Sequence, residues 1–200
     1  MLAISAVLLL GSNHVANGQS VSARDVASFF AGAAVGLGAH ESGHLVLDYG
    51  FGADPGIRKV NAGFIPFFAI THHQVTAGKE YLISSAGFWV QEGGNEFLLG
   101  RHPDLRREHL AFVKGLFAFN VLTSVMYAGT AFVQHGPGER DTNGMAHSAG
   151  VDEPVIGLTV LAPAVLDGAR YYRPRSATLK WVSRASKIGG ALLAIKAAAR

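Results

Sequence analysis

Two histidines and a glutamate stand close together in the segment His40-Glu41-Ser42-Gly43-His44, which has the pattern HExxH. In a helix, positions i and i+4 lie on one face, so the His40 and His44 imidazoles can reach the same metal ion. Glu41 can hold and deprotonate a water molecule there. The alternative is a packing role, in which hydrogen-bonded polar side chains only join neighbouring helices. The spacing favours a zinc site with His40 and His44 as ligands and Glu41 as the general base.

A catalytic zinc site needs a third protein ligand and an open coordination position. The chain contains no cysteine, so the third ligand must be His, Asp or Glu. Leu47 and Gly50 stand where metzincins have glycine and histidine, which excludes that class. The remaining candidates are downstream glutamates, as in thermolysin-like enzymes, and one isolated acid in an apolar segment: Glu80, Glu92, Glu96 and Asp167.

The segments that must position these residues are unusually apolar. Hydrophobic residues make up 49% of the 200, and charged residues 16%, against about 25% in ordinary soluble domains. Four stretches have about the length that a membrane-spanning helix needs, namely 26–47, 81–99, 110–133 and 155–172. The sequence therefore predicts an all-α integral membrane protein with about four transmembrane helices. Ionisable groups inside such segments usually serve a function.

The other segments are too short or too polar to span a bilayer. Residues 1–19 resemble a secretory signal peptide, or else lie upstream of the true start of the protein. Within the membrane domain 20–175, we expect a short re-entrant or interfacial hairpin in 48–79 and an exposed loop at 134–154. Residues 176–200 fit a basic amphipathic helix lying along an anionic membrane surface. The net charge of +3 comes from scattered basic residues, so the sequence does not indicate a nucleic-acid partner.

Four stretches in this order resemble the site-2 protease family of intramembrane zinc metalloproteases. The first is the HExxH segment, which matches HExGH, and the second, 63–68, is similar to the short membrane-dipping hairpin of that family. The third, 85–91, lies where the family has an AGPxxN-like stretch. The fourth, 159–168, resembles NxxPxPPLDG, whose aspartate would here be Asp167.

The resemblance implies a zinc-dependent endopeptidase in a membrane, most simply the bacterial inner membrane, that cuts membrane-anchored proteins or peptides. Zn²⁺ would be held by His40, His44 and Asp167, with Glu41 as the base. Substrate helices would have to unwind, and an extended strand could then pair with the hairpin or with the polar face of 81–99.

The chain departs from the family pattern at several positions that carry proline or asparagine. Phe88 replaces the proline of the third stretch, and Thr159 replaces the asparagine of the fourth. An amide that stabilises the oxyanion would then have to come from Gln91, Asn95 or Asn120. Two alternatives therefore remain: a catalytically inactive zinc-binding membrane scaffold or regulator, and a soluble or periplasmic HExxH zincin.

Overall fold

The computed structural model describes residues 21–62 and 65–199 of the chain. This part of the chain is mostly helical, as predicted, and the four segments expected to be apolar helices coincide with α2, α3, α4 and α6. The predicted N-terminal segment 1–19 lies outside the described residues. The elements follow one another as α2 (Ala23–Phe51), β1 (Gly56–Ala62), β2 (Ile65–Thr71), α3 (Ala77–Arg101), α4 (Ala111–Val133), α5 (Asp141–Ala149), α6 (Glu153–Tyr172) and α7 (Ala177–Ala198).

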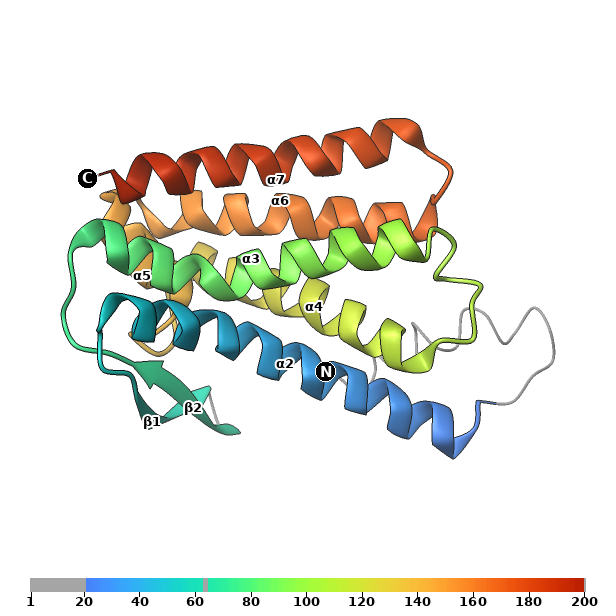
Figure 1. Cartoon of the computed structure of the whole chain (residues 1–200), viewed down its shortest axis with the longest axis horizontal. Coiled ribbons are helices and arrows are strands. Elements are labelled where there is room, and N and C mark those ends of the chain that lie inside the picture. The colour runs from blue at the N-terminus through green and yellow to red at the C-terminus, as the bar shows by residue number, and fades with distance from the viewer. Residues whose placement is uncertain (1–20, 63–64, 200) are drawn as a thin grey trace.

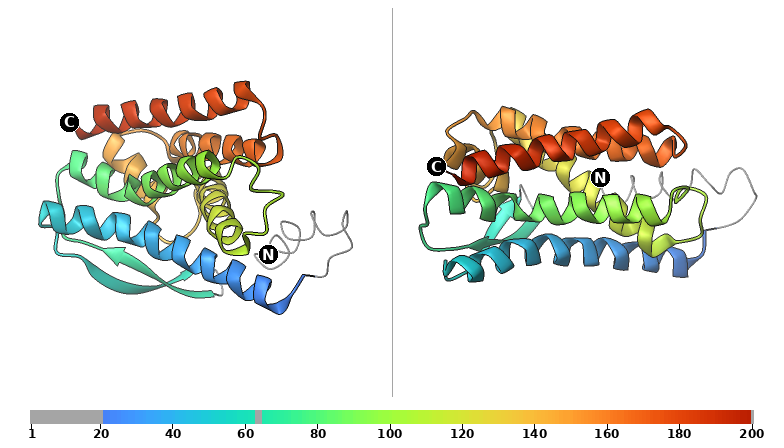
Figure 2. Two further views of the ribbon diagram at one scale, coloured as in Figure 1. Left: turned by 45° about the vertical axis from the view of Figure 1, so that its right-hand side comes forward. Right: turned by 45° about the horizontal axis from the view of Figure 1, so that its top comes forward.

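The long helices lie side by side in one bundle (Figures 1 and 2). Helix α2 packs on α3 and α4, α6 packs on α4, and α7 runs along α6 and α3. Helices α2 and α4 approach closely because glycines stand at their contact. A Cβ added to Gly115 would collide with the Phe29 carbonyl oxygen, and one added to Gly32 would collide with the Phe112 carbonyl oxygen. Small residues of this kind are typical of closely packed membrane helices.

Local signals explain where several helices begin and end. Ser22 and Asp25 form a capping box at the start of α2, and Gly52 ends that helix with a φ of 67° in the left-handed region. Thr76 caps α3 by accepting a hydrogen bond from the Lys79 amide. Ser176 caps α7 in the same way. The ends of these helices therefore follow from the local sequence.

The hairpin expected in 48–79 is an antiparallel pair of strands. Strands β1 and β2 pair from Gly56 opposite Thr71 to Ala62 opposite Ile65. Strand β2 contacts α2, and the hairpin lies beside the C-terminal half of that helix (Figure 1). A two-stranded hairpin is marginal in isolation, so its position depends on this neighbouring helix.

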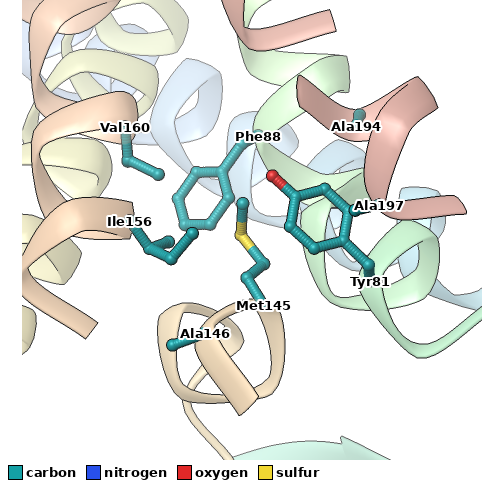
Figure 3. Close-up of a cluster of buried hydrophobic side chains, with 8 residues drawn as sticks. All are labelled: Tyr81, Phe88, Met145, Ala146, Ile156, Val160, Ala194 and Ala197. Carbon is teal, nitrogen blue, oxygen red and sulfur yellow. The ribbon is translucent and has the colours of Figure 1, made fainter. Parts of the chain in front are cut away.

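A buried apolar cluster holds the short helix α5 in place. Met145 and Ala146 of α5 insert among side chains of α3, α6 and α7, as Figure 3 shows. The cluster consists of Tyr81, Phe88, Met145, Ala146, Ile156, Val160, Ala194 and Ala197. Burial of these groups removes apolar area from water at about 25 cal/mol per Å² and fixes α5 at one end of the bundle.

Residues 134–154 differ from the exposed loop that the sequence predicted. Despite their polar, glycine-containing sequence, these residues include the nine-residue helix α5, which ends at Gly150 with a φ of 66°. Thr, Asn and Gly are poor helix formers, so local propensity gave no sign of a helix. Tertiary packing of Met145 and Ala146 stabilises the helix instead.

The helix expected in 176–200 forms as α7, but only two of its four basic side chains, Lys180 and Lys196, are exposed, and the other two point into the bundle. Arg184 and Lys187 form ion pairs with Glu96 of α3, and Lys187 also pairs with Asp167 of α6. These acids need counter-charges in a bundle interior, and α7 supplies them. The outer face of α7 carries Trp181, Ile188, Leu192 and Ile195.

Besides its buried apolar clusters, the described chain exposes many large apolar side chains and buries several polar ones. Each long helix exposes at least one large apolar side chain. The exposed fractions are 68% for Val46, 71% for Phe97, 61% for Met126, 60% for Leu158 and 66% for Ile195. The buried residues include His40, Gln91, Asn120 and Asp167. Of the helices that the structure describes, one, α4, is both long and apolar enough to cross a membrane, so the predicted number of about four spans is not confirmed.

Candidate metal centre

Helix α2 presents both histidines of the HExxH segment to the interior of the bundle. His40 and His44 are 2% and 5% exposed, and their Nε2 atoms lie 3.2 Å apart. The i, i+4 spacing places them one above the other on the face that packs against α3. The sequence-based prediction that both imidazoles point to one place is confirmed.

The third group at this place is Asp141, from the first turn of α5. Its Oδ2 atom lies 3.1 Å from His40 Nε2 and 3.5 Å from His44 Nε2. The fold brings it there across 101 residues of sequence. His40, His44 and Asp141 form the one group of three or more such side chains, within the part of the chain that the structure describes, whose ligand atoms could hold a metal ion.

The separations of these three atoms are close to those expected of ligands on one tetrahedral ion. Ligand bonds of about 2.0–2.1 Å to zinc put neighbouring ligand atoms about 3.3–3.4 Å apart in a tetrahedron. The observed separations are 3.1, 3.2 and 3.5 Å. Two neutral imidazoles and one carboxylate are also a common donor set for zinc and related divalent metals.

A backbone hydrogen bond orients the His44 ring. Its Nδ1 donates to the Ile83 carbonyl oxygen of α3 at 2.8 Å. This bond directs the other ring nitrogen, Nε2, toward His40 Nε2 and Asp141 Oδ2 at the centre of the site. Metal-ligating histidines in general use the second ring nitrogen in this way.

The His40 ring is enclosed by aromatic side chains and by a glycine. Phe88 meets it edge-on with ring centroids 5.6 Å apart, and Tyr127 stacks on it at 6.0 Å. Gly87 of α3 faces the ring directly, and a Cβ there would overlap it. The Tyr127 hydroxyl also interacts with the Asp141 carboxylate. The rotamer of His40 is therefore fixed by packing.

A buried ion pair fixes the start of α5 and so the position of Asp141. Arg140 donates two hydrogen bonds to Glu153 at the start of α6, with distances of 3.1 and 2.6 Å. The Thr142 hydroxyl donates to the same carboxylate at 2.7 Å. Asp141 lies between these two anchors. A bidentate arginine–carboxylate pair adds geometric precision as well as energy.

Electrostatics keep the Asp141 carboxyl ionised. Burial alone would raise its pKa, but the coulombic attraction of His44 and the hydrogen bonds with both histidines outweigh it. The net result is a pKa below the ordinary value for aspartate. An ionised carboxylate is the form that binds a metal.

Glu41 lies next to the three candidate ligands but is not one of them. Its side chain is half-buried, and its carboxylate interacts electrostatically with His40, His44 and Asp141. A carboxylate that is near the ligands but not among them can accept a proton from a molecule held there. This position agrees with the role expected from the sequence.

Asp167, expected as the third ligand, lies elsewhere in the structure. It is fully buried and accepts hydrogen bonds from Ser183 at 2.7 Å and Lys187 at 2.9 Å, both from α7. Arg170 also contacts it at 3.3 Å. The expectation failed because the isolated acid finds its cations on α7, a helix that the sequence placed on the membrane surface. Asp141 takes the position beside the histidines.

The downstream glutamates are also engaged away from the two histidines. Glu96 is paired with Arg170 at 2.6 Å and with Arg184 at 2.8 Å. Glu80 accepts a hydrogen bond from the Ser84 hydroxyl at 3.0 Å and lies 3.5 Å from His72 Nε2. Neither belongs to the group of three, and neither does Glu92.

The three amides considered as oxyanion donors form a separate buried contact between α3 and α4. Asn120 Nδ2 donates to Asn95 Oδ1 at 2.9 Å, and the Ser124 hydroxyl donates to Gln91 Oε1 at 3.4 Å. Asn120 also reaches the Gln91 carbonyl oxygen at 3.4 Å. These bonds hold Asn120 against Asn95, whereas the buried Gln91 Nε2 has no hydrogen-bond partner within the described residues.

Sequence reasoning missed Asp141 because its segment was interpreted as a turn. The weak signal for it was an acid beside an arginine, at the first turn of a segment that ends in glycine. No family model matches the chain, and comparisons with curated proteins and with solved structures give no match. The resemblance to site-2 proteases therefore depends on the motifs in the sequence alone.

Proposed function

We propose that the chain is a zinc-dependent endopeptidase embedded in a membrane, with His40, His44 and Asp141 as metal ligands and Glu41 as the general base. The observation that carries the proposal is the convergence of three ligand atoms 3.1–3.5 Å apart next to the glutamate of an HExxH segment. That combination of donor set, spacing and adjacent base is typical of metal-dependent hydrolases.

The chemistry divides between the metal and the protein. Bound zinc supplies Lewis-acid chemistry, which acidifies a water molecule and polarises a peptide carbonyl. Glu41 accepts the proton of the attacking water and returns it to the leaving amine. Asp141, held by the Arg140–Glu153 pair, and His44, held by the Ile83 carbonyl, keep the ligands in place. Phe88 and Tyr127 limit the access of bulk water to His40.

The distribution of side chains supports the membrane location. Helices α2, α3, α4, α6 and α7 have 20 to 29 residues, so each is long enough at 1.5 Å per residue to cross about 30 Å of hydrocarbon. Buried ionisable residues on α2 and α6, such as His40 and Asp167, lower the average hydropathy of these two helices. Each of the five helices exposes large apolar side chains, which lipid favours.

The hairpin is the natural place for a membrane-anchored substrate to bind. A substrate helix must unwind to be cut, and its unpaired backbone then needs hydrogen-bond partners, which a strand edge offers. Arg58 of β1 pairs with Glu139, two residues before Asp141. This ion pair joins the proposed substrate strand to the loop that carries a metal ligand.

The proposal is tested by zinc content and then by cleavage. Purified protein in detergent should contain about one zinc per chain, and His44→Ala and Asp141→Ala should lose it, whereas the matched control His147→Ala should keep it. Glu41→Gln should keep zinc and lose cleavage of a labelled transmembrane peptide library in proteoliposomes. Wild-type protein without zinc under metal-replete conditions would refute the proposal.

The occupied amide of Asn120 favours a second candidate, an inactive zinc-binding scaffold. Asn120 donates its amide to Asn95 and to the Gln91 backbone carbonyl oxygen, which occupies one of the three amides considered for the oxyanion. This candidate predicts normal zinc binding, no cleavage by the wild type, and a cellular role that survives Glu41→Gln. The soluble zincin would instead be released from membranes by carbonate extraction.

A further inference from the structure

A cavity lined by arginines lies at the end of the bundle away from the proposed metal site. The loop between α3 and α4 and the loop between α6 and α7 meet at that end, while α5 and the hairpin lie at the other (Figures 1 and 2). The cavity measures about 210 Å³. Its lining includes Asp104, Arg106, Arg107, Tyr172, Arg173 and Arg175.

The charge of the cavity is strongly positive and poorly compensated. Four arginines face one acid, a net of about +3 from these side chains. Asp104 pairs with Arg107 at 3.6 Å. Within residues 21–62 and 65–199, Arg106, Arg173 and Arg175 have no ion pair with an acid, and the buried Nε of Arg106 has no hydrogen-bond acceptor. Four clustered guanidinium groups repel one another unless an anion joins them.

Two further features add positive potential. Ser176 lines the cavity and is also the N-cap of α7, so the positive end of a 22-residue helix begins there. The Lys114 ammonium donates to the Arg106 carbonyl oxygen at 3.0 Å and brings another cation beneath the loop. Glu108, the acid that follows Arg107 in the sequence, is already paired, because its Oε2 lies 2.6 Å from His102 Nδ1. The two loops thus build an anion site from separate parts of the chain.

We propose that this cavity binds a phosphate group. Guanidinium groups bind phosphate oxygens through paired hydrogen bonds, and the amides at a helix N-terminus add further donors. In a protein that spans a bilayer, loops at the ends of the long helices lie at headgroup depth, so an anionic lipid is one source of this phosphate. Phosphate dissolved in the aqueous phase is the other. The inference does not depend on the metal site.

Binding can be measured on the full-length protein in detergent by titration calorimetry. The probes are dioctanoyl phosphatidic acid, dioctanoylglycerol as its phosphate-free counterpart, and inorganic phosphate. The test variant is Arg106→Gln/Arg173→Gln/Arg175→Gln. The matched control is Lys59→Gln/Lys180→Gln/Lys196→Gln, which removes the same charge from three exposed lysines outside the cavity lining.

The wild-type protein should bind dioctanoyl phosphatidic acid and should not bind dioctanoylglycerol. The arginine variant should bind phosphatidic acid at least tenfold more weakly than the wild type, and the affinity of the lysine control should stay within twofold of the wild type. Because Arg173 and Arg175 are exposed, the variant with these two replaced alone tests binding without risk to folding. Phosphatidic acid binding more tightly than inorganic phosphate would identify lipid as the source, and equal binding would identify free phosphate. Equal loss in the arginine and lysine variants, or no binding of either phosphate probe, would overturn the proposal.

Discussion

Replacing Gly87 by alanine should damage the metal site while leaving the helical bundle folded. Gly87 lies on α3 opposite the His40 ring, and an added Cβ would lie 2.5 Å from both ring nitrogens. Ordinary carbon contacts are about 3.5–4.0 Å, so the ring or the helix must move by about an ångström. Overpacking of this kind in a tight interior costs about 1–3 kcal/mol.

The same helix offers a matched control in Gly93. A Cβ there meets nothing within 4 Å, so Gly93→Ala changes only the backbone entropy and should stabilise the helix by about 0.5–1 kcal/mol. Gly87→Ala gains the same helix propensity, and the difference between the two variants isolates the clash with His40. If the strain falls on the metal-loaded state, zinc affinity should fall by about tenfold to a hundredfold, at about 1.4 kcal/mol per tenfold.

The assay is competition for zinc with a chelator, together with thermal unfolding followed by circular dichroism. We expect Gly87→Ala to keep its helical spectrum and bind zinc weakly, and Gly93→Ala to behave like the wild type or slightly better. If Gly87→Ala binds zinc as tightly as Gly93→Ala and unfolds at the same temperature, then His40 does not pack against Gly87 and the geometry of the site is wrong.

Three further changes test the supports of the fold and the site. Asp167→Ala should keep zinc but lose about 3–5 kcal/mol of stability, because it leaves Lys187 short of a counter-charge in the bundle; loss of zinc at unchanged stability would contradict this. Glu153→Gln breaks the ion pair that fixes α5, and should weaken zinc binding about 10–100-fold in a chelator titration; unaltered affinity would count against this support. Gly115→Ala should lower the unfolding temperature by separating α2 from α4, at a cost of about 1–3 kcal/mol, and an unchanged temperature would show that the helices are not in contact there.

The long apolar helices and the two histidines could be predicted because their signals are local. Apolar stretches of about 20 residues predict helices whatever lies around them, and α2, α3, α4 and α6 match four such stretches. The i, i+4 spacing of His40 and His44 also holds in any helix. The hairpin was predicted because 63–68 is too short to span and turn residues stand near it.

The third group beside the histidines and the direction of α7 could not be predicted in this way. Two acids, Asp141 and Asp167, each stood about a hundred residues or more beyond the motif, and nothing local distinguished them. The apolar sequence around Asp167 favoured it as the third metal ligand. In the folded chain, however, Lys187 and Arg170 form ion pairs with Asp167 and neutralise its charge. Asp141 lies in a segment of poor helix formers, which tertiary contacts such as the burial of Met145 and the Arg140–Glu153 ion pair stabilise as a helix.

The sequence by itself determined the helical segments, the paired imidazoles and the position of Glu41 beside them, since each depends on the spacing of residues along one helix. Only the tertiary structure decided which carboxylate completes the group and which basic side chains point inward. A charge buried in a bundle must meet its counter-charge in three dimensions, and that pairing is set by which helices lie side by side.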